Sequence, residues 1–264
     1  MVVLDVEYNG WMVVLSTGIA FIGAFAAVSL CEQYRLSTLA DSKANRYLLL
    51  VFVAISLGAV GIWAMHYIAT ASFTLKNDGV IIPIRYNYSM LFVSLVVVCI
   101  MELIALYLAS TDKCFNKSKA KIMEIFIQHA SNKYSLPELK QMTSRKIWMI
   151  VFTHSLHRII LGGFIGGGGV AIMHYLGMMS MEFQGKITYN PGMVALSVIV
   201  AILAVIGGFW VFFRVLSVFP SLDILRIVCA LNGMFSLSGV HYIGMTTAKF
   251  EYDPNMSIPD PATT

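Results

Sequence analysis

The chain has 264 residues, of which 58% are apolar and only 12% are charged, and its mean hydropathy is +0.77. Soluble domains carry roughly 25% charged residues, so a solvated globule of this length is excluded, and a chain this apolar does not stay disordered in water. The composition therefore predicts a polytopic membrane protein. The first apolar run begins almost at Met1 without a basic leader or a cleavage site, so a removable signal peptide is not expected.

Six segments are long and apolar enough to cross a membrane, because a helix needs about 20 apolar residues to span the hydrocarbon. They are Trp11–Cys31, Tyr47–Thr70, Tyr88–Ala109, His157–Met179, Gly192–Phe213 and Asp223–Thr247. Ile147–Leu156 is interpreted as an interfacial lead-in to the fourth helix, since dividing that helix at Gly162–Gly169 would leave two pieces too short to span. Backbone groups within a membrane need internal partners, so the expected fold class is all-α.

The distribution of Lys and Arg predicts the orientation of these spans. Of the 18 basic residues, 14 fall in the loops after spans one, three and five or at the start of span four. The other four are Lys76, Arg85, Lys186 and Lys249. The basic side is expected to be cytoplasmic, which places both termini outside. The predicted organisation is a membrane domain over 9–247, a basic cytoplasmic loop over 110–146 within it, and a short external tail over 248–264. Residues Ala120–Ala130 of the loop form either an amphipathic helix on the inner leaflet or part of a solvated linker.

A motif of the form Y-N-x-x-M-x-x-x-S opens each odd-numbered span. It occurs at residues 8–16, 86–94 and 189–197. A second motif closes each even-numbered span, with a histidine followed by a tyrosine. It reads MHYIAT at 65–70, MHYLGM at 173–178 and VHYIGM at 240–245, and a glycine precedes each histidine by eight residues. The chain is therefore predicted to be three copies of a helix pair.

The three histidines occupy the same register of their helices, within one to two turns of the outer end. His66, His174 and His241 are therefore expected at one depth, together with methionines of both motifs. The candidate metal ligands are His66, His174, His241, Met178, Met245, Met12, Met90, Met193, Met65 and Met173. Met65 and Met173 rank below Met178 and Met245, because a residue adjoining a histidine points to a different helix face, whereas one four positions later shares its face.

Neutral imidazole and thioether form a soft to borderline ligand set, which favours copper over hard ions such as Mg²⁺ and Ca²⁺. Zinc is possible with three histidines, but the methionines would then be unexplained. The structural alternative is that each histidine forms a hydrogen bond between helices and each methionine fills the core. Three matching copies favour ligation over that alternative.

Glu102 is an ionisable residue within span three and has no counterpart in the other copies, where Ala24 and Val205 align with it. A carboxyl group within a membrane is a candidate functional site and needs a partner. Arg158 or His157 at the inner end of span four is the expected partner, and structural pairing is favoured over a proton relay. His154 is expected on the inner side of the membrane and His129 in the basic loop.

The repeated Met-His-Tyr motif at the outer ends of alternate helices resembles the MHYT domain family of integral membrane sensors. The resemblance covers roughly Asn9 to Thr247. It implies a sensory domain that binds copper through its Met and His residues and detects oxygen, carbon monoxide or nitric oxide. Larger members carry domains for cyclic-dinucleotide synthesis or breakdown, or kinases, and 249–264 is too short for one. The expected output is therefore a separate partner, or the loop 110–146.

We therefore expect a copper-binding membrane sensor of a diatomic gas or of redox state, without catalytic turnover. One alternative is a transporter of a metal or small solute, since repeated helix units are common in transporters. A second alternative is a haem-bearing electron-transfer subunit with histidine axial ligands. No catalytic motif is found, and nucleic acid is not an expected partner. The expected environment is the lipid bilayer, most simply that of the cell membrane.

Overall fold

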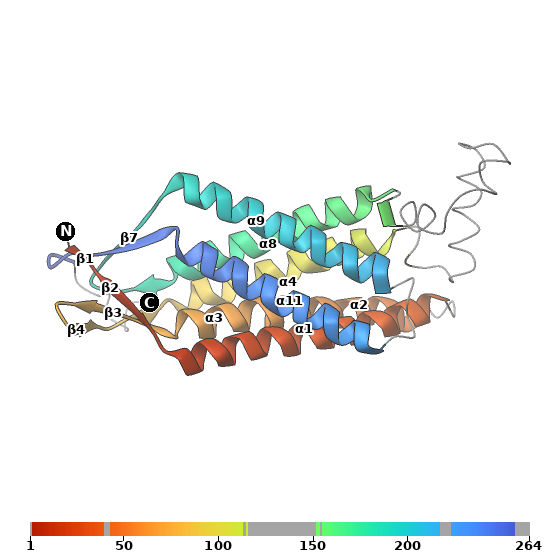
Figure 1. Ribbon diagram of the computed structural model, residues 1–264, viewed down its shortest axis with the longest axis horizontal. Coiled ribbons are helices and arrows are strands. Elements are labelled where there is room, and N and C mark those ends of the chain that lie inside the picture. Colours follow the sequence, from red (N-terminus) through yellow and green to blue (C-terminus); the bar gives the residue numbers. More distant parts are fainter. Residues whose placement is uncertain are drawn as a thin grey trace.

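The computed structural model describes residues 2–39, 43–112, 115, 152–153, 155–216 and 223–256, and Figure 1 shows long helices running side by side with short strands at one end. Most of the predicted basic loop lies outside the described residues, as do Ala120–Ala130, His129 and His154. The predicted lead-in to the fourth helix is described only in part, and the helix itself begins at His157.

Six spans are long and apolar enough to cross a membrane, as predicted. They are α1 (Gly10–Leu39), α2 (Lys43–Ile55) continued by the π-helix η1 (Ser56–Ala64) and by α3 (Met65–Thr70), α4 (Tyr88–Ser110), α8 (His157–Met179), α9 (Pro191–Trp210) continued by the π-helix η2 (Val211–Val215), and α11 (Asp223–Met245). Large apolar side chains such as Phe92, Leu203 and Phe235 are exposed on the outer surface of the bundle, where a bilayer would solvate them. The chain is thus an all-α, multi-pass membrane protein.

Short strands form a layer at one end of the bundle, which we call the cap (Figure 1). Three sheets make it up, in the orders β1-β8-β7, β2-β3-β4 and β5-β6. The strands are β1 (Val2–Val3), β2 (Asp5–Tyr8), β3 (Phe73–Asn77), β4 (Val80–Ile82), β5 (Arg85–Tyr86), β6 (Met181–Glu182), β7 (Gly185–Tyr189) and β8 (Ala248–Tyr252). Asp78 and Gly79 both have positive φ in the β3–β4 turn, as a two-residue hairpin connection requires.

The cap corrects the prediction of a simple external tail over 248–264. Residues Ala248–Tyr252 pair with β7 over their whole length and with β1 at the far end. Phe250 of this strand is buried in an apolar cluster with Leu4, Phe73 and Leu75. Both described ends of the chain therefore lie in the cap (Figure 1), while its position outside the membrane stays a prediction from the basic residues.

The helices form a closed ring in which each copy of the repeat contacts the next. Within the copies, α1 packs on η1 and α3, α4 on α8, and α9 on α11. Between the copies, α4 packs on α2 and η1, α8 on α9, and α11 on α1. The same backbone hydrogen bond closes each pair, because the N–H of Asn9, Asn87 and Asn190 donates to the carbonyl of Ser72, Ser180 and Thr247, respectively. The three predicted copies are therefore quasi-equivalent in space.

An ion pair lies buried at the end of the bundle away from the cap. The guanidinium of Arg214 in η2 donates to a carboxylate oxygen of Asp112 at 2.7 Å, and the two side chains are 0% and 1% exposed. Arg214 directly follows the predicted fifth span and so belongs to the 14 basic residues expected at the cytoplasmic side, but the sequence did not predict its burial. Two paired charges removed from solvent are tolerated only while both partners are present.

We predict that Arg214→Met lowers the free energy of unfolding by about 3–5 kcal/mol, because it removes the guanidinium that pairs with the buried Asp112 carboxylate. Unfolding in detergent micelles, followed by thermal or denaturant titration, measures the loss.

Lys186→Met is the matched control, because Lys186 reaches Glu251 at 3.6 Å in a partly exposed pair and such pairs contribute less than about 1 kcal/mol. Adding Asp112→Leu to Arg214→Met should recover much of the loss. Equal effects of Arg214→Met and Lys186→Met would contradict a buried pair.

Candidate functional site

Three histidines converge inside the bundle beneath the cap. Nδ1 of His66 lies 2.9 Å from Nδ1 of His241 and 3.3 Å from Nδ1 of His174. One ring nitrogen from each residue can be chosen so that all three lie within 4.8 Å of one another. The side chains come from α3, α8 and α11, and the residues are only 3–5% exposed. The sequence could not show whether the histidines share a centre, and the structure places them in one cluster.

Two glycines of the second motif allow this approach. A Cβ built at Gly177 would collide with Nε2 and Cδ2 of His66, and a Cβ at Gly244 would collide with Nε2 of His174. The imidazoles of His66 and His174 therefore lie against the backbone of the histidine-bearing helix of the following copy. Ala69 occupies the corresponding position in the first copy, so the ring of contacts is not strictly three-fold.

The three rings cannot satisfy all of one another's hydrogen-bonding groups. A neutral imidazole carries one N–H and one lone pair, yet Nδ1 of His66 faces two other Nδ1 atoms. It therefore cannot form a separate two-centre hydrogen bond with each. Nε2 of His174 and of His241 are buried without a hydrogen-bond partner among the described residues. A cation held among the three rings could instead be bound by one nitrogen lone pair from each histidine.

A small space of about 10 Å³ adjoins the three rings on the side away from the cap. In every copy it is lined by the histidine, the residue before it and the residue four positions before it. These positions are Met65 and Ile62, Met173 and Val170, and Val240 and Leu237. Side chains on a helix lean toward its N-terminus, which brings these positions beneath the imidazoles.

The structure brings the lower-ranked methionines, and not the higher-ranked ones, to the space beneath the histidines. Met65 and Met173 line the space shared with the histidines and are 2% and 1% exposed. Met178 and Met245 instead pack in the apolar cluster of the cap with Phe73 and Leu75. The residue four positions after a histidine shares its face but lies one turn closer to the cap, and the sequence argument did not weigh this direction.

The methionines of the first motif have a structural role through their backbone. The side-chain oxygens of Asn9, Asn87 and Asn190 accept hydrogen bonds from the backbone N–H of Met12, Met90 and Met193, at 3.4, 3.1 and 3.2 Å. Asparagine at this position caps a helix N-terminus. Met12, Met90 and Met193 are partly exposed, and none of them lines the space beneath the histidines.

The tyrosines of the two motifs meet in all three copies. Their ring centroids lie 5.4–6.1 Å apart at steep interplanar angles, in the pairs Tyr67–Tyr86, Tyr175–Tyr189 and Tyr242–Tyr8. The hydroxyl of Tyr175 also lies 2.6 Å from Oγ of Ser197, the last residue of the first motif. These tyrosines therefore join the histidine-bearing helix to the next odd-numbered span, and the last pair closes the ring onto the first span.

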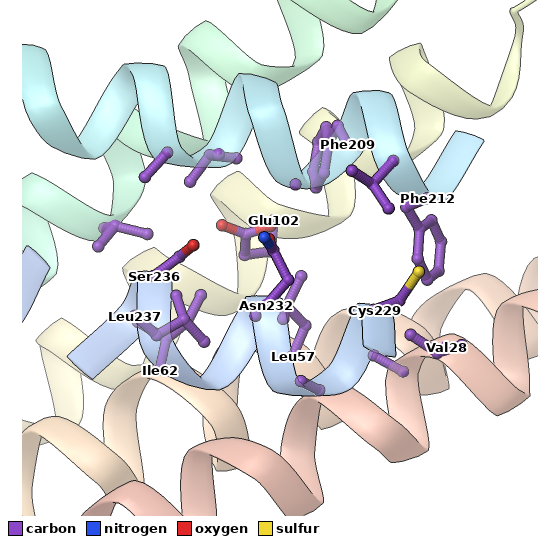
Figure 2. A pocket seen from close by; sticks show the side chains of 18 of the residues that line it. Val28, Leu57, Ile62, Glu102, Phe209, Phe212, Cys229, Asn232, Ser236 and Leu237 are labelled. Atoms are coloured by element: carbon purple, nitrogen blue, oxygen red, sulfur yellow. The ribbon is translucent and has the colours of Figure 1, made fainter. Parts of the chain in front are cut away.

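Glu102 does not have the partner that the sequence suggested. Arg158 donates to the hydroxyl of Thr111 at 2.9 Å, and His157 lies near the hydroxyl of Ser155. Glu102 is fully buried, and neither of its carboxyl oxygens has a hydrogen-bond partner among the described residues. The residue lines a second, larger cavity, which is shown in Figure 2.

Comparison with known proteins agrees with this architecture. The family described as MHYT, "Bacterial signalling protein N terminal repeat", matches residues 60–114 and 167–222. Each match begins shortly before a histidine and ends after the next odd-numbered span. A third unit of the same kind would consist of the end of α11 and the adjoining α1. These two helices are in contact but lie at opposite ends of the sequence.

Two curated relatives are 24% identical to this chain. One is "Bifunctional diguanylate cyclase/cyclic di-GMP phosphodiesterase MucR" of Pseudomonas aeruginosa, matched over 92% of this chain and 28% of its own length. The other is "Signaling protein YkoW" of Bacillus subtilis, matched over 95% of this chain and 25% of its own length. The chain thus spans about a quarter of either relative. No solved structure matches it.

The two family matches and the three quasi-equivalent helix pairs carry the same motifs at the same positions. The chain is therefore a multi-pass membrane protein, and two stretches of it match the MHYT repeat that its sequence resembles.

Proposed function

We propose that this chain is the membrane sensor part of a signalling system and that it binds one copper ion through His66, His174 and His241. The observation that carries the proposal is the meeting of three buried imidazoles, in which Nδ1 of His66 faces two other Nδ1 atoms but can form a two-centre hydrogen bond with only one of them. The two relatives support the signalling role, because both are named as signalling or cyclic-dinucleotide proteins.

The spacing of the nitrogens suits a metal ion. Imidazole nitrogens bind a borderline metal at about 2.0–2.1 Å, so two of them on one ion lie about 3.3–3.6 Å apart. The two Nδ1···Nδ1 distances of 2.9 and 3.3 Å are close to this range. Small rotations of the rings would bring all three nitrogens to one ion. Burial of the rings also favours their uncharged form, which keeps the lone pairs available.

Copper is the metal that the surroundings favour. Met65 and Met173 line the space beneath the rings, and no carboxyl group lines it. Thioether with neutral imidazole favours copper, and Cu(I) in particular, whereas carboxylates would suit harder ions. When bound, copper would supply one-electron chemistry or a position for a diatomic ligand. We therefore propose oxygen, carbon monoxide, nitric oxide or redox state as the signal.

The haem alternative is not supported by this geometry. The imidazole centroids lie 4.9–5.5 Å apart and the space beside them is about 10 Å³. A porphyrin between two axial histidines would have to displace the third ring and the apolar wall. We also propose that this domain does not catalyse a reaction itself, and that the signal passes to a partner or to a further domain of the kind named in the relatives.

Copper retention tests the proposal. Purified in detergent after growth with copper, the parental chain should hold about one copper per chain by elemental analysis. Replacing His66, His174 and His241 together by Ala should abolish retention, because no described nitrogen remains near the centre.

His157→Ala is the matched control, since His157 is exposed at the start of α8. Stoichiometric zinc in place of copper would contradict the metal assignment. Full retention by the triple variant would contradict the site.

Substitution of the methionines tests which of them serve the metal. Met65→Leu with Met173→Leu should weaken retention of Cu(I) by about tenfold or more in a chelator competition, since a soft ligand favours Cu(I). Met178→Leu with Met245→Leu should leave retention nearly unchanged, because these side chains pack in the cap. The opposite order would support the ranking drawn from the sequence.

A methyl group at Gly177 should disrupt the cluster without removing a ligand. Gly177→Ala places a Cβ onto the ring of His66, so we expect a large loss of copper retention. Gly168→Ala, on the same helix with open space around its Cβ, should retain copper and slightly stabilise the helix, since Ala is the better helix former. Equal retention by the two variants would show that contact with Gly177 does not position His66.

A further inference from the structure

A second cavity lies in the middle of the bundle, farther from the cap than the histidines. Its volume is about 90 Å³, and residues from all six spans line it. Four of these residues, Ile62, Val170, Leu237 and Val240, also line the space beneath the histidines. The cavity therefore lies on the line around which the three copies are arranged.

The cavity contains a buried carboxyl group. Glu102 of α4 is 0% exposed and lines the cavity, and neither of its carboxyl oxygens has a hydrogen-bond partner within the part of the chain that the structure describes. Asn232 and Ser236 of α11 line the cavity as well, and in Figure 2 the polar ends of all three side chains lie toward the same space. An unpaired polar group in an apolar interior costs free energy, so a structural role does not explain Glu102.

Comparison of the copies shows that the fold does not require this carboxyl group. Ala24 and Val205 occupy the aligned positions in the other two copies, and both also line the cavity. An apolar residue therefore meets the packing needs of this position twice in the same molecule. A ligand that enters the cavity would give the second copy, which carries Glu102, a reason to differ.

The surroundings of Glu102 favour an uncharged ligand. No Lys or Arg lines the cavity among the described residues, and an isolated carboxylate in an apolar interior is strongly disfavoured. A neutral carboxyl group offers one O–H donor and one carbonyl acceptor. A hydroxyl group is the smallest partner that can accept from the first and donate to the second.

The cavity extends toward the bilayer between α9 and α11. Asn232 is exposed on the surface of α11, and Ala204, Gly208 and Ser236 are partly exposed while they line the cavity. An apolar cavity of 150 Å³ holds benzene, so about 90 Å³ holds only about three or four non-hydrogen atoms. The polar end of a ligand fits inside, and its apolar remainder would leave between these helices.

We propose that the central cavity binds an uncharged, lipid-soluble molecule that carries a hydroxyl group, with Glu102 as its hydrogen-bonding anchor and the bilayer as its source. The site is separate from the histidine cluster and does not depend on copper. The two sites share a wall, which places the second ligand directly beneath the imidazoles.

Photolabelling of the whole chain in lipid nanodiscs tests this proposal. The probe is an octanol that carries a diazirine on its alkyl chain, and peptide mass spectrometry locates the adducts. Excess 1-octanol should suppress labelling of the cavity residues on α9 and α11. Adducts on Glu102 itself, which lies on α4, are not counted. Octane and octylamine should suppress it at least about tenfold less well, because neither forms the paired hydrogen bonds.

Variants at Glu102 distinguish hydrogen bonding by this side chain from the space that it fills. Glu102→Leu should remove the preference for octanol over octane. Glu102→Gln should keep much of it, since an amide also donates and accepts. Ser236→Ala should weaken suppression by octanol, whereas Ser238→Ala, on the same helix but outside the cavity lining, should not. Copper retention, measured on the same samples, should persist in Glu102→Leu.

Other outcomes would overturn the proposal. Equal suppression by octane would show an apolar cavity in which Glu102 has no part. Stronger suppression by octylamine would show a charged carboxylate that binds a cation, as a transporter would need. Absence of suppressible labelling would leave the cavity without this ligand. Because copper retention is read separately, failure here does not depend on the proposed metal site.

Discussion

The close contact of the His66 and His174 imidazoles with the backbone of the next copy determines what this bundle can hold. His66 lies against Gly177 and His174 against Gly244, so the rings reach the centre only because those positions lack a Cβ. The same approach draws three helices of the ring together just beneath the cap. A bulkier residue would have to move an imidazole or a helix, and packed interiors tolerate little of either.

The three copies are alike in the parts that build the fold and differ in the parts that carry chemistry. Asparagine caps, buried serines and tyrosine pairs recur in every copy. The differences are concentrated near the centre, where Val240 stands in place of a methionine and Glu102 in place of Ala or Val. A symmetric scaffold therefore surrounds an asymmetric interior.

Much of this architecture could be predicted from the sequence, because spans, repeats and registers depend on local patterns. Hydropathy located the six spans, and the spacing of glycine and histidine placed the imidazoles at one depth. The cap strands were missed because each has only two to five residues and, apart from the β3–β4 hairpin, they pair with segments far along the chain. The pairing of Arg214 with Asp112 was missed for the same reason, since the two residues are 102 positions apart.

The ranking of the methionines from the sequence did not consider direction along the helix axis. A helical wheel shows which face a residue occupies but not whether it lies above or below a neighbour along the axis. Met65 and Met173 lie on the side of the imidazoles away from the cap, whereas Met178 and Met245 lie on the cap side. The space lies on one side of the rings because of the way in which three helices converge. The sequence of a single helix does not determine this.

The shared wall gives the two candidate sites a direct physical connection. Ile62, Val170 and Leu237 precede their histidines by four residues, so each stands one helical turn from an imidazole and faces both spaces. A molecule that filled the central cavity would press on these side chains, and an ion bound among the rings would constrain the same helical turns from the other side. Coupling between sites requires that each ligand favour a different arrangement of a common element. Here the common element consists of one turn from each of α8 and α11 together with the end of the π-helix η1. A change in the winding of η1 would move His66 relative to the other two rings.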